Sequence, residues 1–205
     1  MSWCDSNTLG IQHIYPAGAI GLESDARVLE ISRNTIDVLN RWYDFNGTNS
    51  FYPAAVRVGY STETILKHLH EWAIQKHPNG LKHGDNPHGI ELCTPAIVTI
   101  NMMLCMGHQN VLRVFKVWPR HLDAKFANIR AFGAFLVSSE IKGGAVQFVR
   151  IHSEAGRDCI VENPWLDEEI QIIRNDKAVG TSTSERLVFE TEEDEVIMLR
   201  PAGLS

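Results

Sequence analysis

The hydrophobic pattern of this chain changes near residue 110, and that change limits the possible fold more than any other feature. Up to His108 the apolar residues recur at the spacing of an α-helix, whereas beyond Asn110 they alternate in short segments separated by turn residues. Helices followed by strands are typical of an α+β chain or of two separate domains. We therefore expect an α+β fold, with a helical region over residues 1–108 and a β domain over residues 111–205.

Four helices are predicted in the first region from the apolar spacing and from residues that favour helix ends. Asp25 precedes the first helix, Ser61 caps the third, and Thr94 caps the fourth. The second is expected to open at Tyr52-Pro53, because proline is tolerated in a first helical turn. The predicted ranges are 25–42, 52–59, 61–76 and 94–106.

The fourth predicted helix is apolar on every face, so we expect it to be buried on all sides. A long polar segment, His77–Cys93, separates it from the third helix, and four helices connected in this way do not readily close into a bundle. We infer that the helical region is an incomplete layer. Its cover would come from another chain or from a missing N-terminal portion of the same polypeptide.

The second region is expected to form an antiparallel sandwich or an open sheet from short strands. The acidic run from Glu190 to Glu195 lies between two apolar segments and is interpreted as a hairpin turn. Phe126–Phe132 is ambiguous and is compatible with a helical turn. The strands are predicted at residues 111–118, 134–141, 145–152, 159–162, 169–173, 187–190 and 196–199.

Composition excludes several classes of protein. Hydrophobic residues make up 44% of the chain and charged residues 21%, which is typical of a globular protein and not of a disordered one. The net charge of −6 is spread along the chain without a basic stripe, so no nucleic-acid partner is expected. No apolar run reaches the ~18 residues of a membrane span. The N-terminus lacks a signal-peptide pattern, so the chain as written is expected to be cytoplasmic, and the location of a longer parent stays open.

The segment from His77 to Glu91 is rich in polar residues that can bind or react. Its three histidines, Asp85 and Glu91 are possible metal ligands, but their spacing matches no metal signature, and ordinary loop polarity is the alternative. His68 and His70 lie two apart on a predicted helix and face different sides, so they do not form a ligand pair. The four cysteines show no metal spacing. We predict neither a metal nor a cofactor.

Glu91 is the strongest candidate for a functional carboxylate. It lies three residues before the cap Thr94 and is flanked by Ile90, Leu92 and Cys93, which places its charge at the edge of an apolar interior. Such a group must be paired, hydrogen-bonded or functional. Two interpretations stay open: a structural partner for backbone donors at the helix start, or a catalytic carboxylate.

Five segments resemble glycoside hydrolase family ninety-five, and they occur in the family's order over about residues 9–155. His13-Ile-Tyr-Pro-Ala-Gly-Ala-Ile20 resembles its histidine-to-"YPGNQI" stretch, and His88-Gly-Ile-Glu91 resembles its "FQIDGNFGG" motif. Met103-Leu-Cys-Met-Gly-His108 resembles its "EMLLQSH" motif. Val111-Leu-Arg-Val-Phe-Lys-Val-Trp-Pro119 resembles "LLPALP", and Arg130-Ala-Phe-Gly-Ala-Phe135 resembles "RARGGF".

The resemblance implies the C-terminal portion of an inverting α-L-fucosidase-like enzyme with a carbohydrate substrate. Residues 1–108 would be the last helical hairpins of an (α/α)6 toroid, and residues 111–205 would be a small C-terminal β-sandwich domain. By position, Glu91 matches the carboxylate that assists the water-activating asparagines, and His13 and His88 match substrate contacts. The general acid and the asparagines have no counterpart here, so we expect the isolated chain to be inactive. Glu91-Leu-Cys93 stands where the family has aspartate, glycine and asparagine, which leaves the sugar open.

The alternative function is a stand-alone carbohydrate-binding or scaffolding module without catalysis, in which replacing Glu91 by glutamine would leave sugar binding unchanged. Sugar-binding platforms usually expose aromatic side chains, and Trp118 and Trp165 are the candidates in the β region. Each lies beside a proline at a strand end, which favours a structural role. The helical region could instead be an interaction module of a protein that is not an enzyme.

Overall fold

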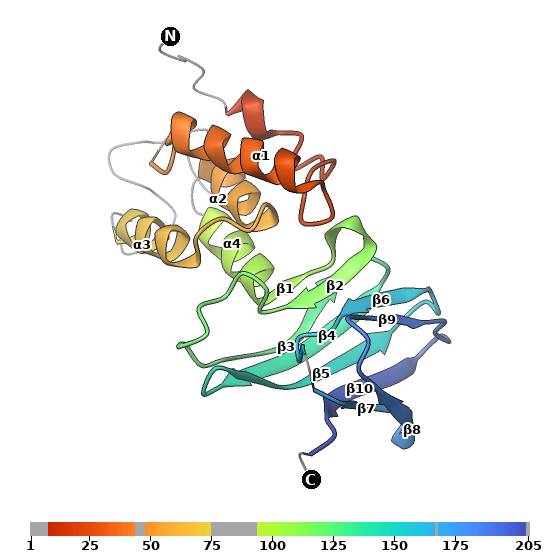
Figure 1. Ribbon diagram of the computed structural model, residues 1–205. Helices are drawn as coiled ribbons and strands as arrows, with labels where there is room; N and C mark the ends of the chain where they lie inside the picture. Colours follow the sequence, from red (N-terminus) through yellow and green to blue (C-terminus); the bar gives the residue numbers. More distant parts are fainter. Residues whose placement is uncertain (1–7, 44–47, 75–93, 167, 204–205) are drawn as a thin grey trace. The chain divides into compact units, whose positions relative to one another are not determined.

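A computed structural model describes residues 8–43, 48–74, 94–166 and 168–203 (Figure 1). Over these residues the chain forms four α-helices and then two β-sheets, so the α+β class is confirmed. The chain divides into two compact units, Met1–Met102 and Met103–Ser205. We call them the helical unit and the sheet unit and describe each by itself.

The helices begin and end close to the predicted residues. They are α1 (Ala26–Leu39), α2 (Thr48–Arg57), α3 (Thr62–Ala73) and α4 (Thr94–Leu104), preceded by the short 3-10 helix η1 (Leu9–Ile11). The predicted cap at Ser61 is confirmed, because its hydroxyl accepts a hydrogen bond from the backbone N–H of Thr64 at 3.3 Å. α1 ends before the predicted residue 42, because Asn40 adopts a left-handed conformation with φ 46°.

Three predictions about the helices are wrong. α2 begins at Thr48, so Pro53 lies inside the helix and not in its first turn. α4 stops at Leu104, because Cys105 and Met106 form a strand that pairs with the chain after the helix. α4 is also not buried on all sides, since Ile97 exposes 65% of its surface. The described part of the helical unit therefore leaves one side of this apolar helix uncovered.

A cluster of aromatic rings forms the centre of the helical unit. Trp42, which is 3% exposed, packs edge-on against Phe51 and Tyr52 and lies parallel to the His68 ring at 4.8 Å between centroids. The Tyr52 hydroxyl donates to the Trp42 carbonyl at 2.9 Å. These contacts join the chain after α1 to both α2 and α3.

The sheet unit contains a four-stranded sheet in the order β1-β2-β6-β9 and a six-stranded sheet in the order β3-β4-β5-β10-β7-β8 (Figure 1). Apolar side chains from both sheets share one core. A short 3-10 helix, η3 (His108–Asn110), follows β1. The strands are β1 (Cys105–Met106), β2 (Val111–Val114), β3 (Ala124–Ala131), β4 (Phe135–Lys142), β5 (Ala145–Ser153), β6 (Cys159–Glu162), β7 (Ile170–Arg174), β8 (Lys177–Ser182), β9 (Arg186–Phe189) and β10 (Glu195–Pro201).

The strand predictions need four corrections. β2 and β6 are parallel, so the sheets are not wholly antiparallel. The first strand ends at Val114 and not at Trp118, because Phe115 has a left-handed backbone with φ 53°. The ambiguous Phe126–Phe132 lies almost entirely in β3 and is not a helical turn. β8 was not predicted. Nearly all of its residues are exposed, so its sequence lacks the alternation of buried and exposed positions that indicates a strand.

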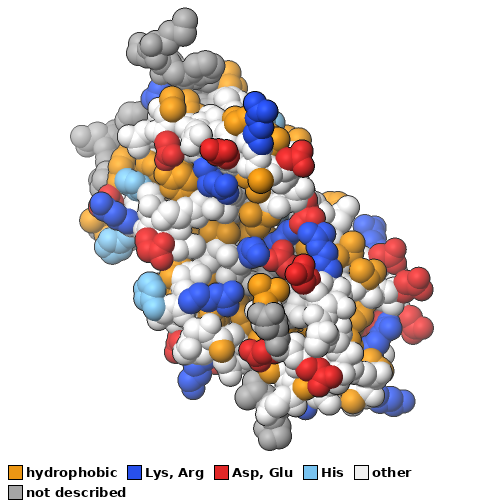
Figure 2. Space-filling model, viewed as in Figure 1, with side chains coloured by type: hydrophobic (Ala, Val, Ile, Leu, Met, Phe, Trp, Pro, Cys, Tyr) orange, Lys and Arg blue, Asp and Glu red, His pale blue; other side chains and the backbone are white. Residues whose placement is uncertain are grey.

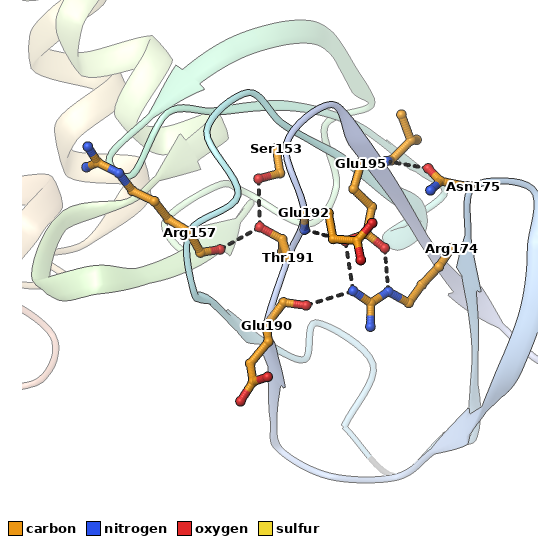
Figure 3. A network of polar contacts seen from close by, with 9 residues as sticks. Ser153, Arg157, Arg174, Asn175, Glu190, Thr191, Glu192 and Glu195 are labelled. Atoms are coloured by element: carbon orange, nitrogen blue, oxygen red, sulfur yellow. Dashed lines mark hydrogen bonds and ion pairs between the residues drawn. The ribbon is translucent and has the colours of Figure 1, made fainter.

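The acidic run from Glu190 to Glu195 is not a hairpin turn, because β9 pairs with β6 in one sheet whereas β10 pairs with β5 and β7 in the other. Buried polar side chains fix this crossing between the sheets (Figure 3). Glu195 accepts from Arg174 and from the backbone N–H of Glu192. Thr191 donates to the Arg157 carbonyl at 2.6 Å. Glu190, Glu192, Glu193 and Asp194 are exposed, so the segment is a solvated crossing that Thr191 and Glu195 anchor through buried contacts.

Candidate functional site

Two of the three predicted site residues, Glu91 and His88, lie outside the described residues, as does the polar segment that contains them. The structure does place the helix that follows. α4 is described from Thr94, the predicted cap, which itself lies in the helix, so Glu91 comes three residues before a helical segment of mostly apolar residues. The carboxylate is thus still assigned by sequence position and by resemblance.

His13, the third predicted residue, lies in a turn that is tightly held to α2. Its carbonyl accepts from the backbone N–H groups of Ala19 at 2.9 Å and Ile20 at 3.2 Å. The Arg57 guanidinium, from the end of α2, donates to the Ile14 carbonyl at 2.9 Å and lies 4.7 Å from the centre of the Tyr15 ring. The His13 side chain is exposed. A rigid backbone therefore presents an accessible imidazole.

A hydrogen-bonded group that the sequence did not predict joins Tyr43, His68 and Glu71 at the surface of the helical unit. The Tyr43 hydroxyl donates to Glu71 and lies 2.7 Å from His68 Nδ1. Because the hydroxyl carries one hydrogen, this arrangement assigns the imidazole hydrogen to Nδ1. The i, i+3 spacing of His68 and Glu71 on a predicted helix was the available sequence signal.

Burial and the charge of Glu71 shift the pKa values of Tyr43 and His68 in this group. Burial, and after it the hydrogen bond and negative charge of Glu71, raise the pKa of Tyr43 to about 12. Burial lowers the pKa of His68 despite the opposing charge of Glu71, which favours the neutral imidazole. His68 packs against Trp42 whereas His70 is exposed, so the two histidines have different surroundings.

A wide apolar groove lies along α1. It has a volume of about 430 Å³ and is lined by Gly10, Ile31, Asn34, Thr35, Val38 and Leu39, which we call the α1 groove. Ile31 is 55% exposed and Val38 is 80% exposed, whereas Ile36 on another face is fully buried. α1 therefore has apolar side chains on two faces, and the described residues cover one of them.

The sheet unit carries an ion-paired cluster beside a small hollow. Arg113 of β2 is 2% exposed and its Nε donates to Glu162 of β6 at 2.6 Å, while Lys116 also pairs with Glu162. Burial raises the pKa of Glu162, but hydrogen bonds from Lys116 and Arg113 outweigh burial and hold that pKa below its usual value. These contacts follow from the parallel pairing of β2 with β6.

The two tryptophans considered as sugar platforms both make structural contacts within the sheet unit. Trp165 is 4% exposed and its indole N–H donates to the Val146 carbonyl at 2.6 Å, so it is not a platform. The Trp118 indole N–H donates to the Leu122 carbonyl at 2.9 Å, and its ring packs edge-on against Phe115. The exposed aromatic of the sheet unit is instead Phe132.

Some broad features of the described residues bear on partners. They contain no group of three or more histidine, cysteine, aspartate or glutamate side chains placed to hold a metal ion. None of the helices among them has the length and apolar character needed to cross a membrane. Figure 2 shows acidic and basic side chains close together on the visible face.

No protein-family model matches this chain, and no curated protein matches it. Function is therefore inferred from the ordered sequence segments and from the geometry of the described residues.

Proposed function

We propose that this chain is the C-terminal portion of an inverting glycoside hydrolase that acts on α-L-fucosides or related glycosides and resembles family ninety-five. In this proposal the helical unit supplies the last hairpins of an (α/α)6 toroid. The sheet unit, whose two sheets share one core, is the C-terminal β-sandwich domain. The substrate is a carbohydrate, and no cofactor or metal takes part.

The observation that carries the proposal is the second apolar face of α1. Ile31 and Val38 are seven residues apart, so they lie on one side of the helix, and both are exposed along the α1 groove. Exposed apolar side chains that line a groove on one side of a helix are compatible with a surface that another element covers. In a toroid of helical hairpins each helix contacts neighbours on more than one side, which agrees with a helix that is apolar on two faces.

The chemistry needs two groups on opposite sides of the scissile bond. Inverting glycosidases place them roughly 6.5–9.5 Å apart, so that one protonates the leaving oxygen while the other assists a water. Glu91 would serve on the water side. The general acid belongs to the missing N-terminal portion, and the accessible His13 would contact sugar hydroxyls together with His88. The chain alone would then bind a glycoside without cleaving it.

Saturation-transfer NMR of the purified chain with methyl α-L-fucopyranoside tests this proposal. We expect transfer to the sugar protons, and we expect Glu91→Gln and His13→Ala each to weaken binding about tenfold, the effect of losing a hydrogen bond to a charged or polar partner. Glu168→Gln, which changes an exposed carboxylate in the sheet unit, is the matched control. Aryl α-L-fucosides should not be hydrolysed.

Each other outcome of that experiment has a definite meaning. Equal affinity in the wild type and in Glu91→Gln, read from sugar-induced shifts of the helical-unit amides alone, would replace the enzyme proposal with the stand-alone sugar-binding module. If none of a panel of pyranosides shows transfer, both the enzyme proposal and the sugar-binding module are overturned. Turnover by the chain alone would show that the general acid does not lie in a missing portion.

The α1 groove leads to a separate prediction about association. Replacing Ile31 by glutamate and Val38 by lysine should reduce both the binding of a dye specific for apolar surface and the concentration-dependent mass measured by light scattering. The free energy of unfolding should change by less than about 0.5 kcal/mol, because both side chains are exposed. Val188→Lys, at a 68% exposed position of β9, is the control. A wild-type monomer that binds no dye would contradict the need for a cover.

A further inference from the structure

A second hollow, of about 120 Å³, lies in the sheet unit and contains no residue assigned to the proposed glycosidase site. Its walls come from three separate segments: the turn around η3, the β3–β4 connection, and the residues before β6. The turn around η3 contributes Gly107 and Asn110. The β3–β4 connection contributes Phe132, followed by Phe135 at the start of β4, and the segment before β6 contributes Arg157 and Asp158. Aromatic and polar groups thus meet at one concave place, and a hollow of this volume is smaller than the usual pocket of about 300–1,000 Å³, which limits its ligand to one small ring.

Phe132 lines the hollow and carries a largely exposed aromatic side chain. It is 70% exposed, whereas Phe135, three residues later in the same hollow, is 3% exposed and belongs to the core. The core therefore uses one ring of this pair and leaves the other on the surface. An exposed aromatic ring offers a flat apolar surface, and its electron-rich face attracts the weakly positive C–H groups of a pyranose ring.

The backbone holds Phe132 in place. A Cβ atom added at Gly107 would lie 2.9 Å from the backbone nitrogen of Phe132, so these two segments are in direct backbone contact. Gly133 follows with φ +92°, a conformation that favours glycine. Ala131 and Phe135 pair on either side of this turn. The ring is thus carried by a defined turn of the sheet.

The polar wall is anchored from the opposite side. The Arg157 carbonyl accepts from Thr191, and the hydroxyls of Thr191 and Ser153 lie 2.7 Å apart, with both residues buried. Figure 3 shows the Arg157 side chain extending away from this network. Arg157 and the adjacent Asp158 are exposed and line the hollow, so they offer a donor and an acceptor next to each other.

The third wall is held in an uncommon backbone conformation. Gln109 and Asn110 have φ of 57° and 59°, two consecutive left-handed residues that are not glycine. Such conformations cost energy and cluster at ligand-binding sites. The Asn110 amide, which is exposed at the hollow, can both donate and accept.

We propose that this hollow binds a single neutral pyranose ring. Phe132 contacts the apolar face of the sugar, Arg157 and Asp158 hydrogen-bond two neighbouring hydroxyls, and Asn110 bonds a third. The opposite charges of Arg157 and Asp158 leave the site without net charge, which favours a neutral sugar over an acidic one. The site binds and does not cleave, and it is independent of the proposed activity at Glu91.

A nitrogen–proton NMR titration of the full chain with methyl α-L-fucopyranoside and methyl β-D-glucopyranoside tests the site. We expect saturable shifts at the amides of Gly107, Gly133 and Asp158 for at least one of the two glycosides. Phe132→Ala should weaken this binding about tenfold, as expected for loss of an aromatic contact worth ~1.4 kcal/mol. Asp158→Asn should also weaken it.

The controls separate this site from others and from misfolding. Val188→Ala shortens another exposed apolar side chain of the sheet unit, outside the hollow, and should leave the affinity unchanged. Glu91→Gln should also leave the shifts at Gly107 and Gly133 unchanged, so this proposal and the proposed function can fail separately. The spectrum of each variant shows whether it is folded. Absence of shifts at the three amides with both sugars, or equal affinity in folded Phe132→Ala, would overturn the proposal.

Discussion

Replacing Glu162 by glutamine is expected to lower the free energy of unfolding of the sheet unit by about 3 kcal/mol. The side chain of Arg113 is 1% exposed and its Nε lies 2.6 Å from Glu162, so the substitution leaves a buried guanidinium facing a neutral amide. Glu162 itself is 22% exposed, and partial access of water places the loss at the lower end for a buried pair. This loss of unfolding free energy is measured by urea unfolding of the two proteins. Hydrogen exchange of the β6 and β9 amides reports the same loss within the sheet unit.

Glu140→Gln is the matched control for this prediction. Glu140 pairs with Lys125 at 3.2 Å, and the two side chains are 29% and 66% exposed, so this pair should contribute about 0–1 kcal/mol. Equal losses in the two variants would contradict the importance we assign to burial.

The same pair predicts a dependence of stability on pH. Burial raises the pKa of Glu162, but the hydrogen bonds from Lys116 and Arg113 outweigh it, so the pKa in the folded state lies below the unfolded value of about 4.3. The stabilisation is therefore present above the unfolded pKa and is lost as the pH falls through the folded pKa. The difference between wild type and Glu162→Gln should shrink below about pH 4.3. A difference that stays constant with pH would contradict this origin.

Trp42→Ala is expected to have a comparable effect in the helical unit, about 3–5 kcal/mol. The ring is 3% exposed and packs against Phe51, Tyr52 and His68, so its removal opens a cavity among rings that cannot close over it. Hydrogen exchange of the α2 and α3 amides should accelerate accordingly. This measurement follows the helical unit by itself.

Two variants control the Trp42 prediction. Trp42→Phe keeps an aromatic ring at the centre of the cluster, so it should lower the free energy of unfolding much less than Trp42→Ala does. Val38→Ala, at an 80% exposed position of α1, should change stability by less than about 0.5 kcal/mol. Unchanged protection of α2 and α3 in Trp42→Ala would show that the cluster does not hold the helices together.

The candidate site could be predicted only where it depends on position in the chain. Sequence places Glu91 three residues before the described part of α4, and the helix itself was predicted, but the roles of Glu91, His13 and His88 stay predictions. The Tyr43, His68 and Glu71 group and the hollow at Phe132 were not predicted. Each joins segments far apart in the chain, and a sequence pattern carries no information about which distant residues meet.

Local interactions let the sequence by itself determine the order of helices and strands and several of their ends. Ser61 caps α3 through a contact three residues away, and short apolar segments on either side of Gly143-Gly144 indicate β4 and β5. The tertiary structure alone decided that β9 and β10 belong to different sheets and that Glu195 is buried beside Arg174. The physical reason is that strand pairing and the burial of a charge depend on partners supplied by distant segments, so the acidic run alone does not reveal that it crosses between two sheets and buries one carboxylate.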